Sequence, residues 1–145
     1  MFEHILIATD GSEIAAKAVS GGLKLAKDLA ARVVAMTASE PWSAFVNAET
    51  IAINFPADAY EKATKEEAAK ILGEVRAEAR TIGVECETLH ITNFPAEAII
   101  ETAKANACDL IVMGSHGRRG IARLVLGSQA TKVVTLSAVP VLVCR

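Results

Sequence analysis

The sequence predicts a single α/β domain over residues 1–145, with an open, Rossmann-like five-stranded parallel sheet and helices on both faces. Short apolar runs of strand length alternate with longer segments of helical periodicity, and strands that alternate with helices form parallel sheets. Most of these runs lack polar alternation, which is typical of strands that are covered on both faces. A chain of 145 residues is also the usual size of one domain.

The first strand and helix are marked by a sharp change of pattern. Residues 4–9 form an apolar run that ends at Asp10 and Gly11, and Ser12 is a favourable helix N-cap. Apolar side chains then recur at helical spacing and predict an amphipathic helix over residues 13–30. Its sheet-facing side is expected to comprise Ala15, Val19, Gly22, Ala26 and Leu29.

The middle of the chain holds a second strand, a long connection and the clearest helix. Residues 32–38 are mainly apolar, and the connection that follows, over about residues 39–56, is of a length that often serves function. Residues 58–82 have one apolar face opposite Glu and Lys side chains, and Gly83 is a natural terminator. That face consists of Ala68, Ile71, Leu72, Val75, Ala79 and Ile82.

The last third of the chain repeats the alternation of strands and helices. Residues 85–91 alternate polar and apolar side chains, which indicates an edge strand with one wet face. Pro95 suits the first turn of a helix that runs to about residue 106. The remaining elements are a buried strand over 109–113, a helix over 128–137 and a final strand over 140–144.

The composition argues against several classes of function. The net charge is −2, which gives no strong attraction to nucleic acid or to an anionic membrane. No apolar run reaches the roughly 20 residues that span a bilayer, and no basic region precedes the first apolar stretch, so we expect a cytoplasmic protein. The cysteines are far apart and form no CxxC pair, so we expect reduced, small hydrophobic side chains and no metal centre; they are Cys86, Cys108 and Cys144.

Unusual residues follow two of the predicted strands. The first strand ends in Thr9-Asp10-Gly11-Ser12, and the fourth is followed by residues 114–120, Gly-Ser-His-Gly-Arg-Arg-Gly. Ligands of open α/β sheets bind outside the carboxyl ends of the strands, where the strand order reverses. If both segments face one crevice, strands one and four are neighbours, which favours the order 3-2-1-4-5.

The segment after the fourth strand has the spacing Gly114-x2-Gly117-x9-Gly127-Ser128. Glycine permits a positive φ and a close approach of backbone to a ligand, and successive N–H groups can form an anion nest. Ser128 begins a helix whose N-terminus favours phosphate, and its hydroxyl can cap that helix, donate to a phosphate or approach a metal. Arginines suit phosphate because their planar fork binds two oxygens; the loop contains Arg118, Arg119 and Arg123. These features together predict a phosphate-bearing ligand.

Other nucleotide-binding and phosphate-binding motifs are missing. The sequence has no GxxxxGK[ST] P-loop, and the first strand–helix turn has no GxGxxG. A response regulator would need an acceptor Asp after the third strand, where the chain has Thr92 and Asn93. His116 is the only histidine at the predicted site and is expected to contact the ligand, since no Ser/His/Asp set can be placed with it.

These residues resemble the universal stress protein family, in its nucleotide-binding form. The resemblance covers essentially the whole chain and includes the opening Ile5-Leu6-Ile7-Ala8-Thr9-Asp10-Gly11-Ser12 and the stretch from Asp109 to Gly117. The glycine spacing matches the family's ATP-binding motif, and Pro140 to Cys144 matches its last strand. The resemblance implies a fold of the adenine nucleotide alpha hydrolase type with the 3-2-1-4-5 order.

The resemblance also implies where a ligand binds. ATP, or AMP or ADP, is expected between strands one and four, with Mg²⁺ or Mn²⁺ held between phosphate oxygens and no side-chain ligand other than, at most, Ser128. A homodimer is expected through residues 140–144, because an open strand edge invites pairing. The nucleoside end is expected at Ala8, Thr9 and Asp10, the adenine at Ala38, the ribose at Met113 and Gly114, and the phosphates at Gly117, Gly127, Ser128 and Gln129, with Ser115, His116, Arg118 and Arg119 completing the set.

Two positions depart from the family pattern. Ala8 stands where proline is frequent, and Ala38 stands where a larger aliphatic side chain often packs on adenine. The lost methyl groups weaken apolar contact by about 1–2 kcal/mol, so affinity is expected to fall by about tenfold, or the pocket to accept another nucleotide.

The sequence is therefore compatible with three hypotheses of function. The first is a nucleotide-binding regulatory protein whose ligand orders a surface that a partner recognises. The second is a slow ATP hydrolase or self-phosphorylating protein, for which Ser115, Ser128 and His116 are the candidate groups. The third is a dimeric interaction module that uses no nucleotide.

Overall fold

The computed structural model describes residues 1–47, 56–117 and 126–145. Its five parallel strands are hydrogen-bonded in the order β3-β2-β1-β4-β5, which confirms the predicted fold and strand order. The strands are β1 (His4–Ala8), β2 (Arg32–Ser39), β3 (Cys86–Thr92), β4 (Leu110–Gly114) and β5 (Val141–Cys144). The helices are α1 (Glu13–Leu29), the short 3₁₀ helix η1 (Trp42–Ala44), α3 (Ala57–Ile82), α4 (Pro95–Ala105) and α5 (Ser128–Leu136).

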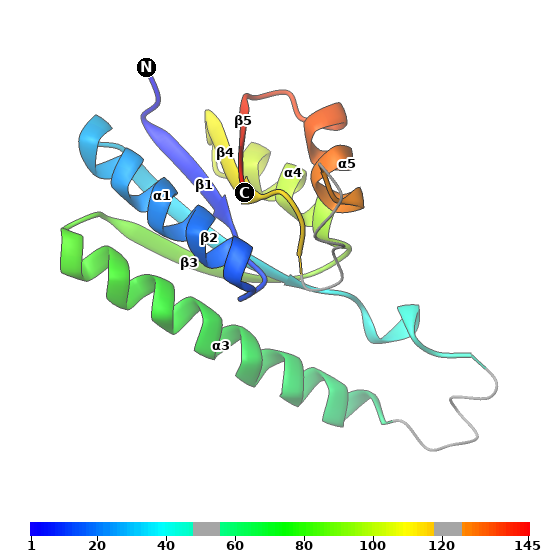
Figure 1. Ribbon diagram of the computed structural model, residues 1–145. Coiled ribbons are helices and arrows are strands. Elements are labelled where there is room, and N and C mark those ends of the chain that lie inside the picture. Colours follow the sequence, from blue (N-terminus) through cyan, green and yellow to red (C-terminus); the bar gives the residue numbers. More distant parts are fainter. Residues whose placement is uncertain (48–55, 118–125) are drawn as a thin grey trace.

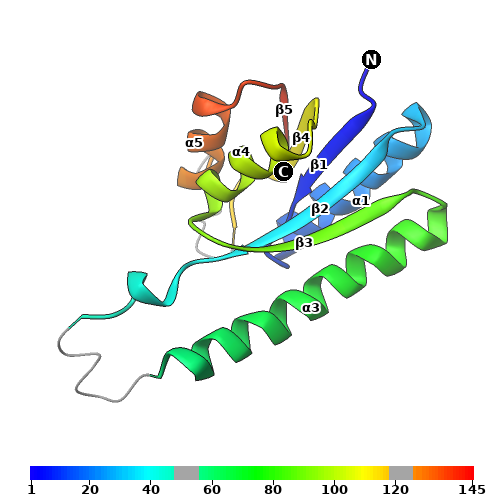
Figure 2. The same cartoon turned by 180° about the vertical axis from the view of Figure 1, so that it is seen from behind.

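The sheet lies between two layers of helices (Figures 1 and 2). Alternate side chains of β1 point to opposite faces, so Ile5 and Ile7 pack with α1 and α3, whereas Leu6 packs with α4 and α5. All three side chains have no exposed surface. The unbroken apolar run of β1 therefore serves two separate cores, as expected for a central parallel strand.

Local signals begin and end the helices as predicted. The Ser12 side chain accepts a hydrogen bond from the Ala15 N–H and caps α1, and Gly83 ends α3 with a left-handed φ of 76°. Pro95 lies in the first turn of α4. The predicted inner face of α1 was wrong at one position: Leu29 is 40% exposed, and Leu23 is fully buried instead. Leu29 is the last residue of α1 and precedes the left-handed Ala30, so it lies where the helix leaves the core.

The predicted edge strand and cysteine environments also agree with the structure. β3 is an edge strand and is partly exposed along its length. All three cysteines are free, with Cys108 buried and the other two half-buried. Burial raises the pKa of the Cys108 thiol to about 11, so it is protonated at neutral pH. Within the described ranges, no helix has the length and apolar character needed to cross a membrane.

The predicted long connection contains some ordered structure of its own. β2 continues to Ser39, and η1 follows before residues 48–55, which lie outside the described part of the chain. The Tyr60 hydroxyl donates to the Glu40 carbonyl at 2.5 Å, and the Phe45 and Tyr60 rings lie 5.6 Å apart. These contacts tie the exit of β2 to the first turns of α3, which run beyond the sheet in Figure 1.

Two adjacent glycines of α1 give a test of the packing between α1 and β1. A Cβ on Gly21 meets no atom within 4 Å, whereas a Cβ on Gly22 would lie 2.8 Å from Ile7 Cδ1. Gly21→Ala is expected to stabilise the protein by about 0.5–1 kcal/mol, because alanine favours helix. Gly22→Ala is expected to destabilise it by about 1–3 kcal/mol through overpacking. Urea unfolding measures the change in stability of each variant. Equal free energies of unfolding for the two variants would contradict the close packing of α1 on β1 at Gly22.

Candidate functional site

The carboxyl ends of β1 and β4 meet at one place, as predicted. The two strands pair in parallel with Ile7 opposite Val112, so the segments that follow them lie side by side. A Cβ added to Gly117 would collide with the carboxylate of Asp10. The first strand's turn and the glycine segment therefore meet where the crevice is predicted.

The turn after β1 is held by its own side chains. Asp10 Oδ1 accepts a hydrogen bond from the Ser12 N–H at 3.0 Å, and Thr9 Oγ1 accepts one from the Gly11 N–H at 3.1 Å. Gly11 has a φ of 79°, a conformation that glycine adopts without strain. Asp10 is half-buried, so its carboxylate is positioned and still reachable from the crevice.

The three motif glycines serve close packing of the protein on itself. None of them has a positive φ, so that predicted role was wrong for Gly114, Gly117 and Gly127. A Cβ on Gly114 would lie 2.8 Å from Ile14 Cγ2, and one on Gly127 would lie 3.1 Å from His116 Cα. At Gly127 the neighbours include backbone atoms of Ser115 and His116, which leave no room for a side chain, whereas at Gly114 and Gly117 the nearest atoms belong to the side chains of Ile14 and Asp10.

The start of α5 lies beside the predicted crevice. Gly127 is its N-cap, with a φ of −69° and a ψ of 165°, and among the described residues no side chain caps the helix. Ser128 is therefore the first helical residue, and its hydroxyl does not fill the capping role that was one of its predicted options. The first intrahelical bond runs from the Thr131 N–H to the Gly127 carbonyl at 2.9 Å. The N–H groups of residues 128–130 have no acceptor within the helix, and anions are stabilised at such a first turn.

Ser115 joins the glycine segment to β5 and α5. Its side chain is 2% exposed, and its hydroxyl and His116 Nδ1 are 3.1 Å apart. The Ser115 N–H donates to the Cys144 carbonyl at 2.7 Å, and its carbonyl accepts from the Gly127 N–H at 2.6 Å. Ser115 therefore links the glycine segment to β5 and to the N-cap of α5, and His116 is the more accessible of the pair.

Some predicted site residues point elsewhere. The side chain of Gln129 accepts a hydrogen bond from the Ala96 N–H at 3.2 Å and so supplies the cap that the start of α4 lacks. Ala8 and Met113 are 7% and 6% exposed and belong to the core under α4 and α5. Arg118 and Arg119, like Arg123, lie outside the described residues.

Lys132 of α5 and Glu97 of α4 form an ion pair beside the Gln129 contact. The hydrogen bond from Lys132 is the main cause that lowers the pKa of the Glu97 carboxyl. This ion pair and the Gln129 side chain together join α5 to the first turn of α4. These contacts add to the packing of the buried Ala130 and Val133 of α5 in placing the helix.

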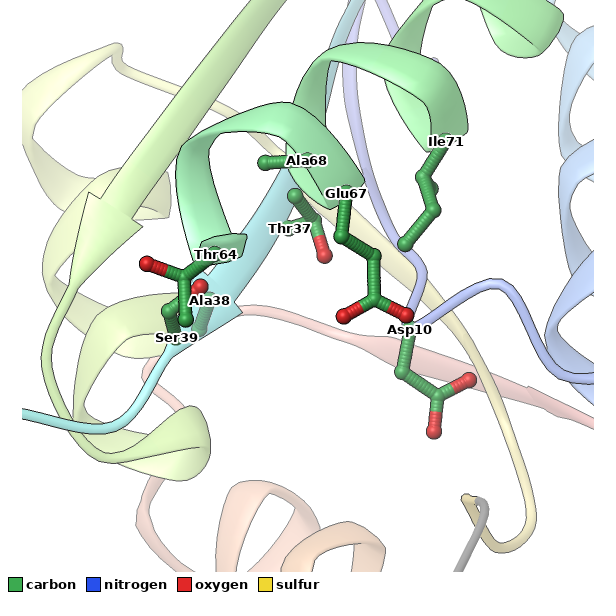
Figure 3. A pocket seen from close by; sticks show the side chains of 8 residues that line it. All are labelled: Asp10, Thr37, Ala38, Ser39, Thr64, Glu67, Ala68 and Ile71. Atoms are coloured by element: carbon green, nitrogen blue, oxygen red, sulfur yellow. The ribbon is translucent and has the colours of Figure 1, made fainter. Parts of the chain in front are cut away.

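A hollow of about 160 Å³ lies on the other side of Asp10, between the end of β2 and α3 (Figure 3). Asp10 and Ala38 line it, as two of the predicted residues, and Thr37 and Ser39 flank Ala38. The remaining lining residues come from α3 and were not predicted: Thr64, Glu67, Ala68 and Ile71. Their helical spacing gives an inner face of α3, but only the packing of α3 beside β2 brings that face to Asp10.

Ser39 has a partner on the edge strand. Its hydroxyl lies 2.8 Å from His90 Nε2. Burial, and then the positive charge of Lys65, lower the pKa of His90, so its ring is neutral at pH 7. The contact fixes Ser39 at the rim of the hollow, and sequence reasoning gave no signal for it.

The sequence pattern of the universal stress protein family matches residues 1–145. The chain belongs to the universal stress protein family. Universal stress protein YxiE of Bacillus subtilis is 34% identical over 148 residues, and the match covers 100% of both chains. The family resemblance stated from the motifs is therefore confirmed at the level of the family.

Solved structures of universal stress proteins have the same fold. Protein MJ0577 of Methanocaldococcus jannaschii is similar with a TM-score of 0.80 and 27% identity, over 99% of this chain and 96% of that one. A universal stress protein in complex with cAMP has a TM-score of 0.72 and 26% identity, over 99% and 97% of the chains. A family member from Archaeoglobus fulgidus in complex with dAMP has a TM-score of 0.68 and 20% identity, over 100% and 98%. Members of this family thus bind adenine nucleotides.

The contact of Gln129 with α4 can be tested by substitution. Gln129→Ala leaves the buried Ala96 N–H without its acceptor and is expected to lower the free energy of unfolding by about 0.5–2 kcal/mol, the usual effect of losing a helix cap. Gln129→Glu keeps an acceptor oxygen, so its free energy of unfolding is expected to fall by less than that of Gln129→Ala. Urea unfolding measures both, and an alanine variant as stable as the wild type would show that this contact contributes nothing.

Proposed function

We propose that this universal stress protein is an ATP-binding regulatory protein of the cytoplasm, with the phosphates at the start of α5 and the nucleoside along Asp10. The observation that carries the proposal is the close approach of the Asp10 carboxylate to Gly117, together with the packing of Gly127, the N-cap of α5, against the neighbouring His116. The family's complexes with adenine nucleotides support it.

Each end of the crevice has chemistry that suits one part of a nucleotide. The first-turn N–H groups of α5 and the helix dipole favour phosphate oxygens. The carboxylate of Asp10 only accepts hydrogen bonds, and the ribose hydroxyls are donors. A nucleotide that lies between them has its phosphates at Ser128 and its sugar at Asp10.

A divalent cation fits the same arrangement. Mg²⁺ in proteins is commonly bound by substrate phosphates together with one or two protein oxygens. The exposed hydroxyl of Ser128 stands at the start of α5 and is the side chain that would approach Mg²⁺ or Mn²⁺ there. The cation would neutralise phosphate charge, and the backbone of α5 would orient the phosphates.

The geometry gives less support to a phosphoryl-transfer role. Ser115, a candidate acceptor, is 2% exposed, and its hydroxyl is engaged with His116. A phosphoryl acceptor must reach the terminal phosphate in line with the leaving oxygen, and a side chain this deeply buried does not. This argues against Ser115 as the acceptor, and we favour a role in which nucleotide occupancy, rather than turnover, is what a partner recognises.

Ser128→Pro tests the phosphate end without disturbing the helix. Proline is favoured at the first helical position, and the extended backbone of Gly127 suits a residue before proline. The variant loses one N–H group and the hydroxyl, so its affinity for Mg-ATP in isothermal titration is expected to fall by about tenfold or more.

Ser128→Ala is the matched control, because it loses the hydroxyl and keeps the N–H group. It is expected to bind Mg-ATP more tightly than Ser128→Pro, and thermal denaturation should show both variants as stable as the wild type. Equal binding by the wild type and Ser128→Pro would refute this phosphate site. Absence of binding by the wild type would refute the proposed function.

We also propose that the protein forms a homodimer through residues 140–144. β5 is an edge strand, and Leu142 on it is 42% exposed. A lysine on an edge strand hinders the pairing of that strand with another chain. Leu142→Lys is therefore expected to change a dimer into a monomer, which light-scattering measurements of molar mass detect. Leu136→Lys, at a 59% exposed position on α5, is the control and should leave the dimer intact. A wild-type monomer would contradict the proposal.

A further inference from the structure

The hollow between β2 and α3 has a size that suits part of a nucleotide. Its volume of about 160 Å³ is several times the roughly 30 Å³ that a water molecule occupies. It is also smaller than the roughly 300–1,000 Å³ of pockets that enclose a whole small-molecule ligand. One ring system of a larger ligand is therefore the fitting occupant.

The position of the hollow relative to Asp10 indicates which part of a nucleotide would occupy it. Asp10 lines the hollow and also contacts the glycine segment at Gly117, so it stands between the hollow and that segment. A nucleotide with its phosphates at α5 and its ribose at Asp10 continues past Asp10 into the hollow. The base of the nucleotide is then the part that meets α3.

The walls of the hollow combine apolar surface with two carboxylates, those of Asp10 and Glu67, and with the hydroxyls of Thr37, Ser39 and Thr64. Ala38 of β2 and Ala68 of α3 are small, and Ile71 adds a larger apolar side chain. In Figure 3 the Glu67 side chain extends from α3 into the same space, with its carboxylate toward Asp10. Small apolar groups leave room for a flat ring, and a carboxylate can only accept hydrogen bonds from it.

We propose that Glu67 is the residue that selects the base, by accepting a hydrogen bond from the exocyclic 6-amino group of adenine. Adenine presents this N–H donor where guanine presents the O6 acceptor, and an acceptor facing the carboxylate is disfavoured. This inference rests on the proposed nucleotide binding and adds to it the residue that decides which nucleotide is bound.

The test compares three ligands by isothermal titration: Mg-ATP, purine riboside 5′-triphosphate (ATP without the 6-amino group) and Mg-GTP. The wild type is expected to bind ATP about tenfold more tightly than the analogue without the amino group, the size of one hydrogen bond to a charged group. In Glu67→Leu the ratio of the affinity for ATP to the affinity for the analogue is expected to fall nearly to one. In Glu67→Gln the ratio of GTP to ATP affinity is expected to rise, because the amide can donate to O6.

Glu66→Leu is the matched control. Glu66 is the preceding residue of α3 and is exposed, as Glu67 is, but it does not line the hollow, so this variant loses the same charge and is expected to keep the wild-type preferences. Thermal denaturation shows whether each variant is folded. If the role of Glu67 were merely structural, its substitution would lower the affinities for all three ligands equally and leave the ratios of these affinities unchanged.

The outcomes separate this inference from the proposed function. If the wild type binds ATP and the ratios do not change in the Glu67 variants, the inference is overturned and nucleotide binding stands. If the wild type does not discriminate ATP from the analogue, the inference is likewise overturned. If none of the three ligands binds, both the proposed function and the inference fall.

Discussion

The parallel pairing of β1 with β4 is the contact on which the rest of the structure depends. The Asp109 carboxylate accepts hydrogen bonds from the Glu3 and His4 N–H groups at 2.9 and 3.2 Å, and the Asp109 N–H donates to the His4 carbonyl. These bonds set the register at the start of both strands. Because strands have a fixed rise per residue, the same register determines which residues meet at their other ends, where Asp10 reaches Gly117.

Two kinds of contact then complete the crevice on either side of that pairing. On the β5 side, close backbone packing at Gly127 and the hydrogen bonds of Ser115 hold the start of α5 in place. On the β2 side, α3 packs beside the strand and closes the hollow. In the proposed mode of nucleotide binding, the phosphate end would depend on backbone and the base end on side chains, so substitutions would alter the base that is selected without disturbing the phosphate contacts.

Elements that depend on local pattern were predicted well. The apolar runs, the Ser12 cap, the Gly83 terminator and Pro95 all act within a few residues of themselves, so the sequence contains their whole cause. Leu29 was misplaced because helical periodicity alone does not say where a helix leaves the core. The positive φ expected of the motif glycines was also wrong, because their spacing is required by neighbours that the linear sequence does not reveal.

By itself, the sequence determined the order of the elements, the neighbouring position of strands one and four, and the presence of Asp10 and the glycine segment at their ends. Only the tertiary structure decided which side chains complete the site. It turned Gln129 toward α4, buried Met113 in the core, and brought Thr64, Glu67 and Ile71 of α3 to the hollow. The physical reason is that strand and helix signals arise from neighbours along the chain, whereas the direction of a side chain at a site depends on packing between segments that are far apart in sequence.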